Sequence, residues 1–178
     1  MRTQRLIAYA FATCLVLLVT GSAIAADEPG NHNAFLKGTY RIFSQTSGVG
    51  STAHGYFIGV ITYDGHGQAR MTDRGTIIDS NNHSDPPSAP SFRETGIFTY
   101  AVKRDGSFTQ EGSFTSNPEE SFTYTITGVK WVGQIGPDGS VLILSGAIPP
   151  EPSIFTHEGV SSEGLGGFSA TAVRIPHE

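Results

Sequence analysis

Cysteine is almost absent from this chain of 178 residues, and its single copy, Cys14, lies in the N-terminal apolar segment. The chain beyond that segment therefore has no disulfide, no thiol nucleophile and no cysteine-ligated metal site. Such a chain must be held together by its apolar core alone, and about 150 residues are enough to bury one.

Basic residues are scarce as well, with 11 Lys and Arg against 16 Asp and Glu. Two of the basic residues, Arg2 and Arg5, belong to the N-terminal segment, so the chain from residue 26 onward carries a net charge of −7 with histidine neutral. Binding to a phosphate backbone needs clustered Lys and Arg, and no basic stripe is present. We therefore expect neither nucleic acid nor an anionic membrane surface as a partner.

Long apolar runs are missing, and the one candidate, residues 6–19, is shorter than the roughly 20 residues of a membrane-spanning helix. It follows a basic start and precedes Ala23-Ile24-Ala25, the small-residue pattern of a signal-peptide cleavage site. The pattern predicts a leader over residues 1–25 that is removed on export to the periplasm or the medium; an N-terminal anchor helix is the alternative. We expect no membrane span in the mature chain.

Helical periodicity is also absent, and alternating polar and apolar residues bounded by Gly, Pro, Asn and Asp take its place. A polar arm over residues 26–37, ending in one helical turn, precedes a single all-β domain over residues 38–178. Because consecutive antiparallel strands usually pair, we predict an eight-stranded antiparallel up-and-down β-barrel, with a two-sheet β-sandwich as the alternative. The eight predicted strands are residues 38–44, 56–63, 68–78, 93–103, 107–115, 121–135 (with a bulge at Gly128), 141–145 and 167–175.

The connections between these strands fall into two kinds. Tight hairpin signals stand at Asp64-Gly65, Asp105-Gly106 and Asp138-Gly139. In an up-and-down barrel they alternate with the other connections, so the tight turns gather at one end and the long loops at the opposite end. Loops on a rigid scaffold often carry sites, and we therefore expect a ligand mouth at the long-loop end. The connections at that end are residues 45–55, 79–91, 116–120 and 146–166; they include every long loop, while 116–120 is a short link.

Three histidines, His54, His83 and His157, fall in three of these long loops. Imidazoles gathered at one rim could bind zinc or act as acid and base. However, no His-x-His or His-Glu-x-x-His spacing supports a metal site, and three solvated surface histidines are the alternative. The sequence therefore names these three as rim residues and predicts neither a metal nor another cofactor.

Carboxylates on the predicted strands are a second kind of candidate. If two of Asp73, Glu94 and Glu111 share the barrel interior, they form an acid–base pair; the alternative is that they face solvent on the outer surface. No Gly-x-Ser-x-Gly elbow and no phosphate-binding glycine loop is present. No motif therefore assigns a catalytic residue.

Aromatic residues occur on most predicted strands, and small eight-stranded barrels either fill with side chains or hold one small ligand. Most of the aromatics suit a packed core. A tyrosine hydroxyl needs a partner when it is buried, which singles out Tyr100 and Tyr124. Together with Tyr40 and Trp131 they are the aromatic candidates for contact with a ligand.

Gly38-Thr39-Tyr40 resembles the Gly-x-Trp opening of lipocalins and other calycins, with Tyr in place of Trp. A short helical turn precedes that opening in the group, and Arg174 on the last predicted strand is placed like the arginine that packs over the aromatic. The resemblance implies an eight-stranded barrel closed at its N-terminal end, and it adds Arg174 to the candidate ligand-contacting residues. The other lipocalin motifs are missing from this chain.

Two related phrases, residues 59–67 and 96–106, resemble secreted bacterial barrels of unassigned function. Those barrels are in turn similar to the allene-oxide-cyclase and dirigent barrels, which bind apolar or phenolic molecules and guide cyclisation or coupling. No catalytic residue carries over from that resemblance, and a shared fold alone does not fix a function.

Three functions follow from these observations. The first is an exported barrel that binds a small, largely apolar ligand through the long-loop end; the second is a barrel isomerase or cyclase; the third is a non-catalytic envelope interaction protein with a filled interior. Whether the protein is an enzyme stays open, and a pocket containing a buried, partnered carboxylate or histidine would favour the enzyme. Strands such as residues 56–63 are apolar on both faces, which indicates cover by the loops or by another subunit.

Overall fold

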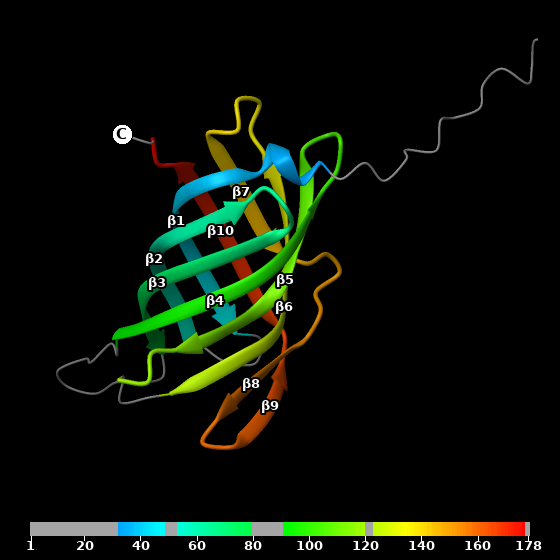
Figure 1. Ribbon diagram of the computed structural model, residues 1–178. Helices are drawn as coiled ribbons and strands as arrows, with labels where there is room; N and C mark the ends of the chain where they lie inside the picture. Colours follow the sequence, from blue (N-terminus) through cyan, green and yellow to red (C-terminus); the bar gives the residue numbers. More distant parts are fainter. Residues whose placement is uncertain (1–31, 49–52, 80–90, 120–122, 177–178) are drawn as a thin grey trace, which may run out of the picture. The chain divides into compact units, whose positions relative to one another are not determined.

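The computed structural model describes residues 32–48, 53–79, 91–119 and 123–176 (Figure 1). The predicted leader and the first residues of the predicted arm lie outside these ranges. No helix in the described part of the chain is long and apolar enough to span a membrane. The described elements are η1 (Asn33–Phe35), β1 (Lys37–Gly48), β2 (Ala53–Asp64), β3 (Gln68–Asp79), β4 (Ser91–Val102), β5 (Ser107–Ser116), β6 (Tyr124–Ile135), β7 (Val141–Gly146), β8 (Ser153–His157), β9 (Val160–Gly164) and β10 (Gly166–Arg174).

Eight of these strands close into an antiparallel barrel. They follow the order β5-β4-β3-β2-β1-β10-β7-β6, and β5 pairs with β6 to complete the ring. The predicted up-and-down barrel is therefore confirmed, and the sandwich alternative is not adopted. Along each strand every second side chain points inward, most clearly in β4, where buried and exposed residues alternate without a break.

The stretch of residues 146–166, predicted as a loop, instead contains the hairpin β8–β9, so that prediction was wrong. The reason is a difference in length: β7 has 6 residues and β6 has 12, so the first half of β6 extends beyond its neighbour. β8 fills that place by pairing Ile154–His157 with Tyr124–Thr127. Glu158 and Gly159 form the turn, both with positive φ (48° and 76°), as a two-residue type I′ hairpin requires.

A β-bulge separates the two halves of β6. Gly112 of β5 lies opposite Val129, while Phe114 lies opposite Ile126, so two residues of β6 oppose one of β5. Gly128, with φ at +71°, is one of the two, which confirms the bulge predicted there. Because a bulge bends its strand, this one marks the point at which β6 exchanges β7 for β8 as its neighbour.

The three tight turns share one construction and lie at the same end of the barrel, beside η1 (Figure 1). In each, the backbone N–H two residues after an aspartate donates to that aspartate's Oδ1. The donors are His66 to Asp64 at 2.6 Å, Ser107 to Asp105 at 2.9 Å and Ser140 to Asp138 at 3.0 Å. The glycine that follows each aspartate has positive φ. The three predicted tight turns at one end of the barrel are therefore confirmed, whereas at the other end β1 and β2 extend through most of the predicted loop 45–55, so the length of that loop was overestimated.

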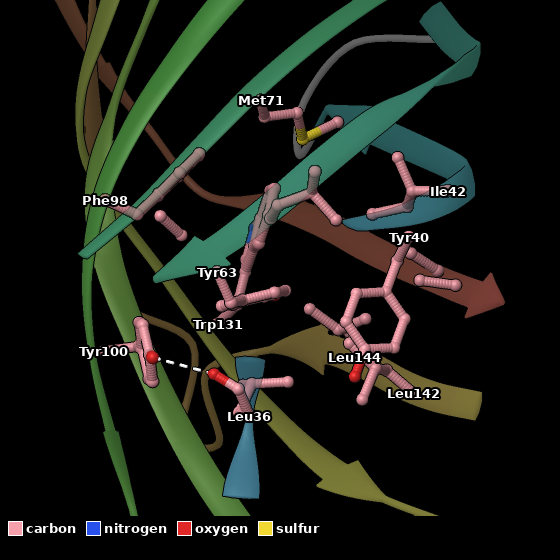
Figure 2. Close-up of a cluster of buried hydrophobic side chains, with 14 of the residues drawn as sticks. Leu36, Tyr40, Ile42, Tyr63, Met71, Phe98, Tyr100, Trp131, Leu142 and Leu144 are labelled. Atoms are coloured by element: carbon pink, nitrogen blue, oxygen red, sulfur yellow. Dashed lines mark hydrogen bonds between the residues drawn. The ribbon is translucent and has the colours of Figure 1, made fainter. Parts of the chain in front are cut away.

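The tight-turn end is sealed by buried side chains and by η1. Leu36, directly after η1, is fully buried, and its carbonyl oxygen accepts a hydrogen bond of 2.8 Å from the hydroxyl of Tyr100 (Figure 2). The same hydroxyl accepts the N–H of Gly65 at 2.9 Å. Arg174 lies over the ring of Tyr40, 5.4 Å from its centroid, and donates to its hydroxyl at 2.9 Å. We call this half of the barrel the closed end.

A row of outward-facing residues crosses four neighbouring strands, β2, β1, β10 and β7, and is apolar at three of its four positions. Ile58 lies opposite Phe43, Phe43 opposite Thr171, and Thr171 opposite Ile143. The three hydrophobic members of this row are exposed. Cover of this face by another subunit, expected from the two-sided apolar pattern, stays a prediction.

Candidate ligand cavity

The size of the inward-facing side chains changes along the barrel. At the closed end the strands contribute large ones, including the fully buried Tyr40, Tyr63 and Phe108. Further along the same strands, the inward positions are occupied by small residues such as Ser44 on β1 and Gly59 on β2. Protein interiors are otherwise close-packed, so this taper leaves a space inside the long-loop half, which we call the open end.

That space is a cavity of about 410 Å³, within the range of roughly 300–1,000 Å³ typical of small-molecule sites. Its wall comes from β1 to β8 and β10, with β7 contributing only its last residue, Gly146, and from the segment after β7. Most of the lining is apolar. The largest apolar contributors are Phe57, Phe114, Ile126, Trp131, Phe155 and Phe168.

Trp131 is the centre of the aromatic part of the wall. Its ring stacks on Phe168 with centroids 3.9 Å apart and planes 6° apart. Phe98 and Phe114 pack against it at 5.0 Å and 5.6 Å, and against each other edge to face. Aromatic contacts of this kind stabilise a surface beyond its buried area, so the wall is held in place before any ligand arrives.

Two acidic side chains interrupt the apolar lining. Asp73 on β3 and Glu94 on β4 are cross-strand neighbours, both line the cavity, and they are only 8% and 9% exposed. Because like charges in a buried site cannot both ionise without a large cost, two adjacent carboxyls must share protons.

Their ionisation follows from this placement. Burial raises the pKa of Asp73 to about 9, and both the charge of Glu94 and a hydrogen bond to it act in the same direction. Burial also raises the pKa of Glu94, but hydrogen bonds from Tyr124 and Asp73 oppose that rise. Asp73 is therefore protonated at neutral pH, and the pKa of Glu94 is raised above its ordinary value, although its two hydrogen bonds limit the rise.

Tyr124 on β6 completes this group. Its hydroxyl donates to Oε2 of Glu94 at 2.6 Å. Its backbone is fixed by the Ser116 side chain, whose Oγ accepts the Tyr124 N–H at 2.7 Å. Phe92 packs on the tyrosine ring edge to face, and Phe155 of β8 stacks on it at 5.4 Å. The hairpin β8–β9 therefore helps to position a cavity residue.

One oxygen of the acid pair has no partner. Oδ1 of Asp73 is buried and accepts no hydrogen bond from any described residue. Gly59 lies directly opposite Asp73 on β2, and a Cβ at that glycine would stand 2.3 Å from the Cβ of Asp73. The absence of a side chain at position 59 is thus what admits the aspartate. Nε2 of Gln110 also lacks a described partner, but Gln110 does not line the cavity.

The aromatic and arginine candidates from the sequence divide between the two ends. Tyr124 and Trp131 line the cavity. Tyr40, Tyr100 and Arg174 lie instead at the closed end, where their polar groups bind the backbone of the turns and of the chain around η1. Ligand contact by the five residues stays a prediction.

The histidine candidates do not form a group in the described chain. His54 is an exposed residue of β2 and His157 belongs to β8, so placing them in loops was wrong. The reason is that β2 begins earlier than predicted and that the predicted loop after β7 contains β8. Neither lines the cavity, and Nδ1 of His157 lies 2.6 Å from the carbonyl oxygen of Thr123. His83 lies outside the described residues.

Two of the three acidic candidates face the barrel interior, one of the two possibilities that the sequence left open. Asp73 and Glu94 share the interior, while Glu111 is exposed on the outer face of β5, opposite Lys130. Among the described residues, no group of three or more His, Cys, Asp or Glu side chains could hold a metal ion.

Sequence reasoning missed Gly59, Ser116 and Phe155 as parts of the site. Phe155 was detectable, because Ile154, Phe155 and Thr156 are three consecutive residues of types that favour strands. The prolines on either side of Glu151 hid that signal. No protein-family model and no curated protein matches the chain, so its function has to be inferred from this geometry.

Proposed function

We propose that this protein is an exported barrel that binds a small, largely apolar or aromatic ligand, which enters at the open end. The observation that carries the proposal is the cavity of about 410 Å³ inside the long-loop half of the barrel. An apolar pocket with a few convergent polar groups is the usual form of a small-molecule site. Export rests on the leader pattern of residues 1–25.

The packing around Trp131 supports an aromatic or otherwise flat apolar ligand. Phe114, Trp131 and Phe168 offer a preformed aromatic wall, and burial of apolar surface stabilises a complex by about 25 cal/mol for each Å² removed from water. A pocket of this kind also argues against an interior filled with side chains, on which the interaction-protein hypothesis depended.

A second function, a barrel isomerase or cyclase, is favoured by Asp73, Glu94 and Tyr124. Two carboxyls and a phenol lie together in a largely apolar cavity, so one carboxylate can accept a proton while another group donates one. In such an enzyme Glu94 would be the base, and Asp73 or Tyr124 the acid. The aromatic wall would hold the reacting molecule in a folded shape.

Ligand binding can be tested with the neutral fluorescent probe N-phenyl-1-naphthylamine, whose emission rises in apolar surroundings. We expect saturable binding with one site per chain. Ser44→Phe places a large side chain in the cavity wall and should abolish the signal. Gln45→Phe introduces the same residue on the exposed outer face of β1 and is the matched control.

Two results would contradict the proposal. One is wild-type protein that gives no saturable emission; the other is loss of binding by both variants or by neither. Native mass spectrometry of protein purified from its own host then identifies the natural ligand, which should co-purify with the wild type and not with Ser44→Phe. If the host compound is chemically altered during incubation with the protein, the isomerase or cyclase replaces the simple binder.

A further inference from the structure

The acid pair indicates the chemical class of the ligand. We propose that the cavity takes an amine: a cationic nitrogen on an aromatic or apolar body, with the ammonium group bound between Asp73 and Glu94. This inference rests on the proposed function, because it assumes that the cavity receives a small molecule.

Charge is the first argument. The charged side chains that line the cavity are Asp73, Glu94, Lys130 and Glu151. Lys130 and Glu151 form an ion pair with each other and are 37% and 48% exposed, so they neutralise each other at the solvent side. The deeply buried charge is therefore negative only. A carboxylate ligand would meet repulsion there, whereas a cation would be attracted in a largely apolar environment, where charges interact more strongly than in water.

Hydrogen bonding is the second argument. Glu94 Oε2 already accepts the Tyr124 hydroxyl, but Asp73 Oδ1 accepts nothing from the described residues. A buried acceptor without a donor is costly, and an ammonium group has three donors and no acceptor. The ammonium group can therefore donate one hydrogen bond to Oδ1 of Asp73 and another to a second carboxylate oxygen. A hydroxyl has one donor, and a carboxylate has none.

Proton balance is the third argument. Before binding, Asp73 holds a proton at neutral pH; when R–NH₃⁺ enters, this carboxyl can ionise and release its proton to the solvent, while the ammonium keeps its three hydrogens. Each of the two carboxylates then faces a cation rather than another anion.

Other titratable and charged groups surround Asp73 and Glu94. On the cavity side they are Tyr124 and Lys130 on β6, Glu151 after β7, and His157 on β8, which pairs with Tyr124 along the backbone. On the outer face, Arg41, Arg74 and Arg93 of β1, β3 and β4 line surface hollows that also reach Asp73. The side chains of β1, β2 and β10 that line the cavity are uncharged. Of these surroundings, only Tyr124 contributes to the pKa shifts of the two carboxyls, apart from their action on each other and their burial. Binding of an amine should therefore release up to one proton, and affinity should rise with pH until the amine itself loses its proton.

The test uses three probes that share one body and differ in charge: 2-phenylethylamine, 2-phenylethanol and 3-phenylpropionate. Trp131 is the only tryptophan of the chain and lines the cavity, so its fluorescence reports binding, and displacement of N-phenyl-1-naphthylamine gives a second readout. We expect the amine to bind at least about tenfold more tightly than the alcohol, the effect of one charge-assisted hydrogen bond in a buried site. The carboxylate should bind most weakly.

The double variant Asp73→Asn, Glu94→Gln keeps the shape of both side chains and removes their charge. It should bind the amine no better than the alcohol, while its affinity for the alcohol stays near that of the wild type. Because the variant contains no buried charge, it should remain folded, which its thermal transition will establish; Asp73→Asn alone is the second variant. Glu111→Gln, a carboxylate on the outer face of β5, is the matched control and should keep the wild-type preference.

Calorimetry in two buffers with different ionisation enthalpies measures proton release directly. Wild type should release protons when it binds the amine, and the double variant should release none. Equal affinities for amine and alcohol in the wild type would overturn the inference, as would a preference for the amine that survives in the double variant. If N-phenyl-1-naphthylamine binds but no charge preference appears, the amine inference fails alone; if no probe binds at all, the proposed function fails with it.

Discussion

The two ends of this barrel are built by the same strands and differ in the size and polarity of the side chains that face the interior. At the closed end, the hydroxyls of Tyr40, Tyr63 and Tyr100 each have a hydrogen-bond partner at 3.0 Å or less, although Nε2 of Gln110, the partner of Tyr63, has none among the described residues. At the open end, small residues leave a cavity and Asp73 keeps an oxygen without a partner. Buried polar groups that are satisfied stabilise a fold, and those that are not usually mark a site. We therefore expect the closed end to contribute mainly to stability and, under the proposed function, the open end to recognition.

The largest contrast between the ends should appear when each loses a large apolar side chain. Leu36→Ala empties a fully buried position at the closed end and should lower the free energy of unfolding by about 2–5 kcal/mol. Phe168→Ala, at the cavity wall, should cost less because its site already adjoins open space and the residue is only partly buried. Urea denaturation measures both. Equal losses would mean that the two ends are packed alike.

A smaller effect separates the ends by pH. Because the folded-state pKa of Asp73 is raised to about 9 from an ordinary value near 4, the folded protein holds a proton that the unfolded chain releases over this range. Stability should therefore be greatest below this window and fall as pH rises through it, by at most about 1.4 kcal/mol per pH unit.

Asp73→Asn removes the titrating group, so its free energy of unfolding, measured by urea denaturation at several pH values, should fall less steeply between pH 5 and 8. Glu111→Gln should keep the wild-type slope, because Glu111 faces solvent. Parallel curves for wild type and Asp73→Asn would show that Asp73 is ionised in the folded state at these pH values.

The smallest predicted contrast compares two tyrosine hydroxyls. Tyr100→Phe leaves the Gly65 N–H and the Leu36 carbonyl without their partner and should cost about 1–3 kcal/mol in unfolding experiments. Tyr124→Phe should instead change ionisation: it removes the hydrogen bond that lowers the pKa of Glu94, so that pKa should rise. The carboxyl stretching bands in infrared spectra, recorded against pH, would report this. A loss of stability by Tyr124→Phe as large as that of Tyr100→Phe would erase the distinction.

Much of the fold could be predicted from the sequence because its signals are local. Asp64, Asp105 and Asp138, each followed by glycine, each predict a tight turn, and polar and apolar residues alternate along the strands between the turns. The cavity could not be predicted, because it depends on how side chains from eight strands fill one volume. The acid pair lies between these cases: Glu94 has the same parity as Phe98 and Tyr100 along β4, so alternation alone points it inward. Only the register of β3 against β4 shows that Asp73 is its neighbour.

The errors have physical causes of the same kind. The prediction that His54 and His157 lie in loops was wrong because strand ends are set by pairing with neighbouring strands, and both histidines are paired residues. The hairpin β8–β9 was missed because its existence depends on the unequal lengths of β6 and β7, which only the assembled sheet reveals.

That hairpin has a consequence for how copies of the protein behave beside one another. Closure into a ring leaves a β-sheet without free edges, but in the described chain β9 is the last strand of the sheet order and pairs only with β8. An unpaired edge invites strand addition from a neighbouring molecule. Here the edge is only 5 residues long, is exposed throughout, and carries Glu163 among serines and glycine. A short edge that carries a charge discourages such pairing, so the hairpin that brings Phe155 to the cavity wall should add little risk of aggregation.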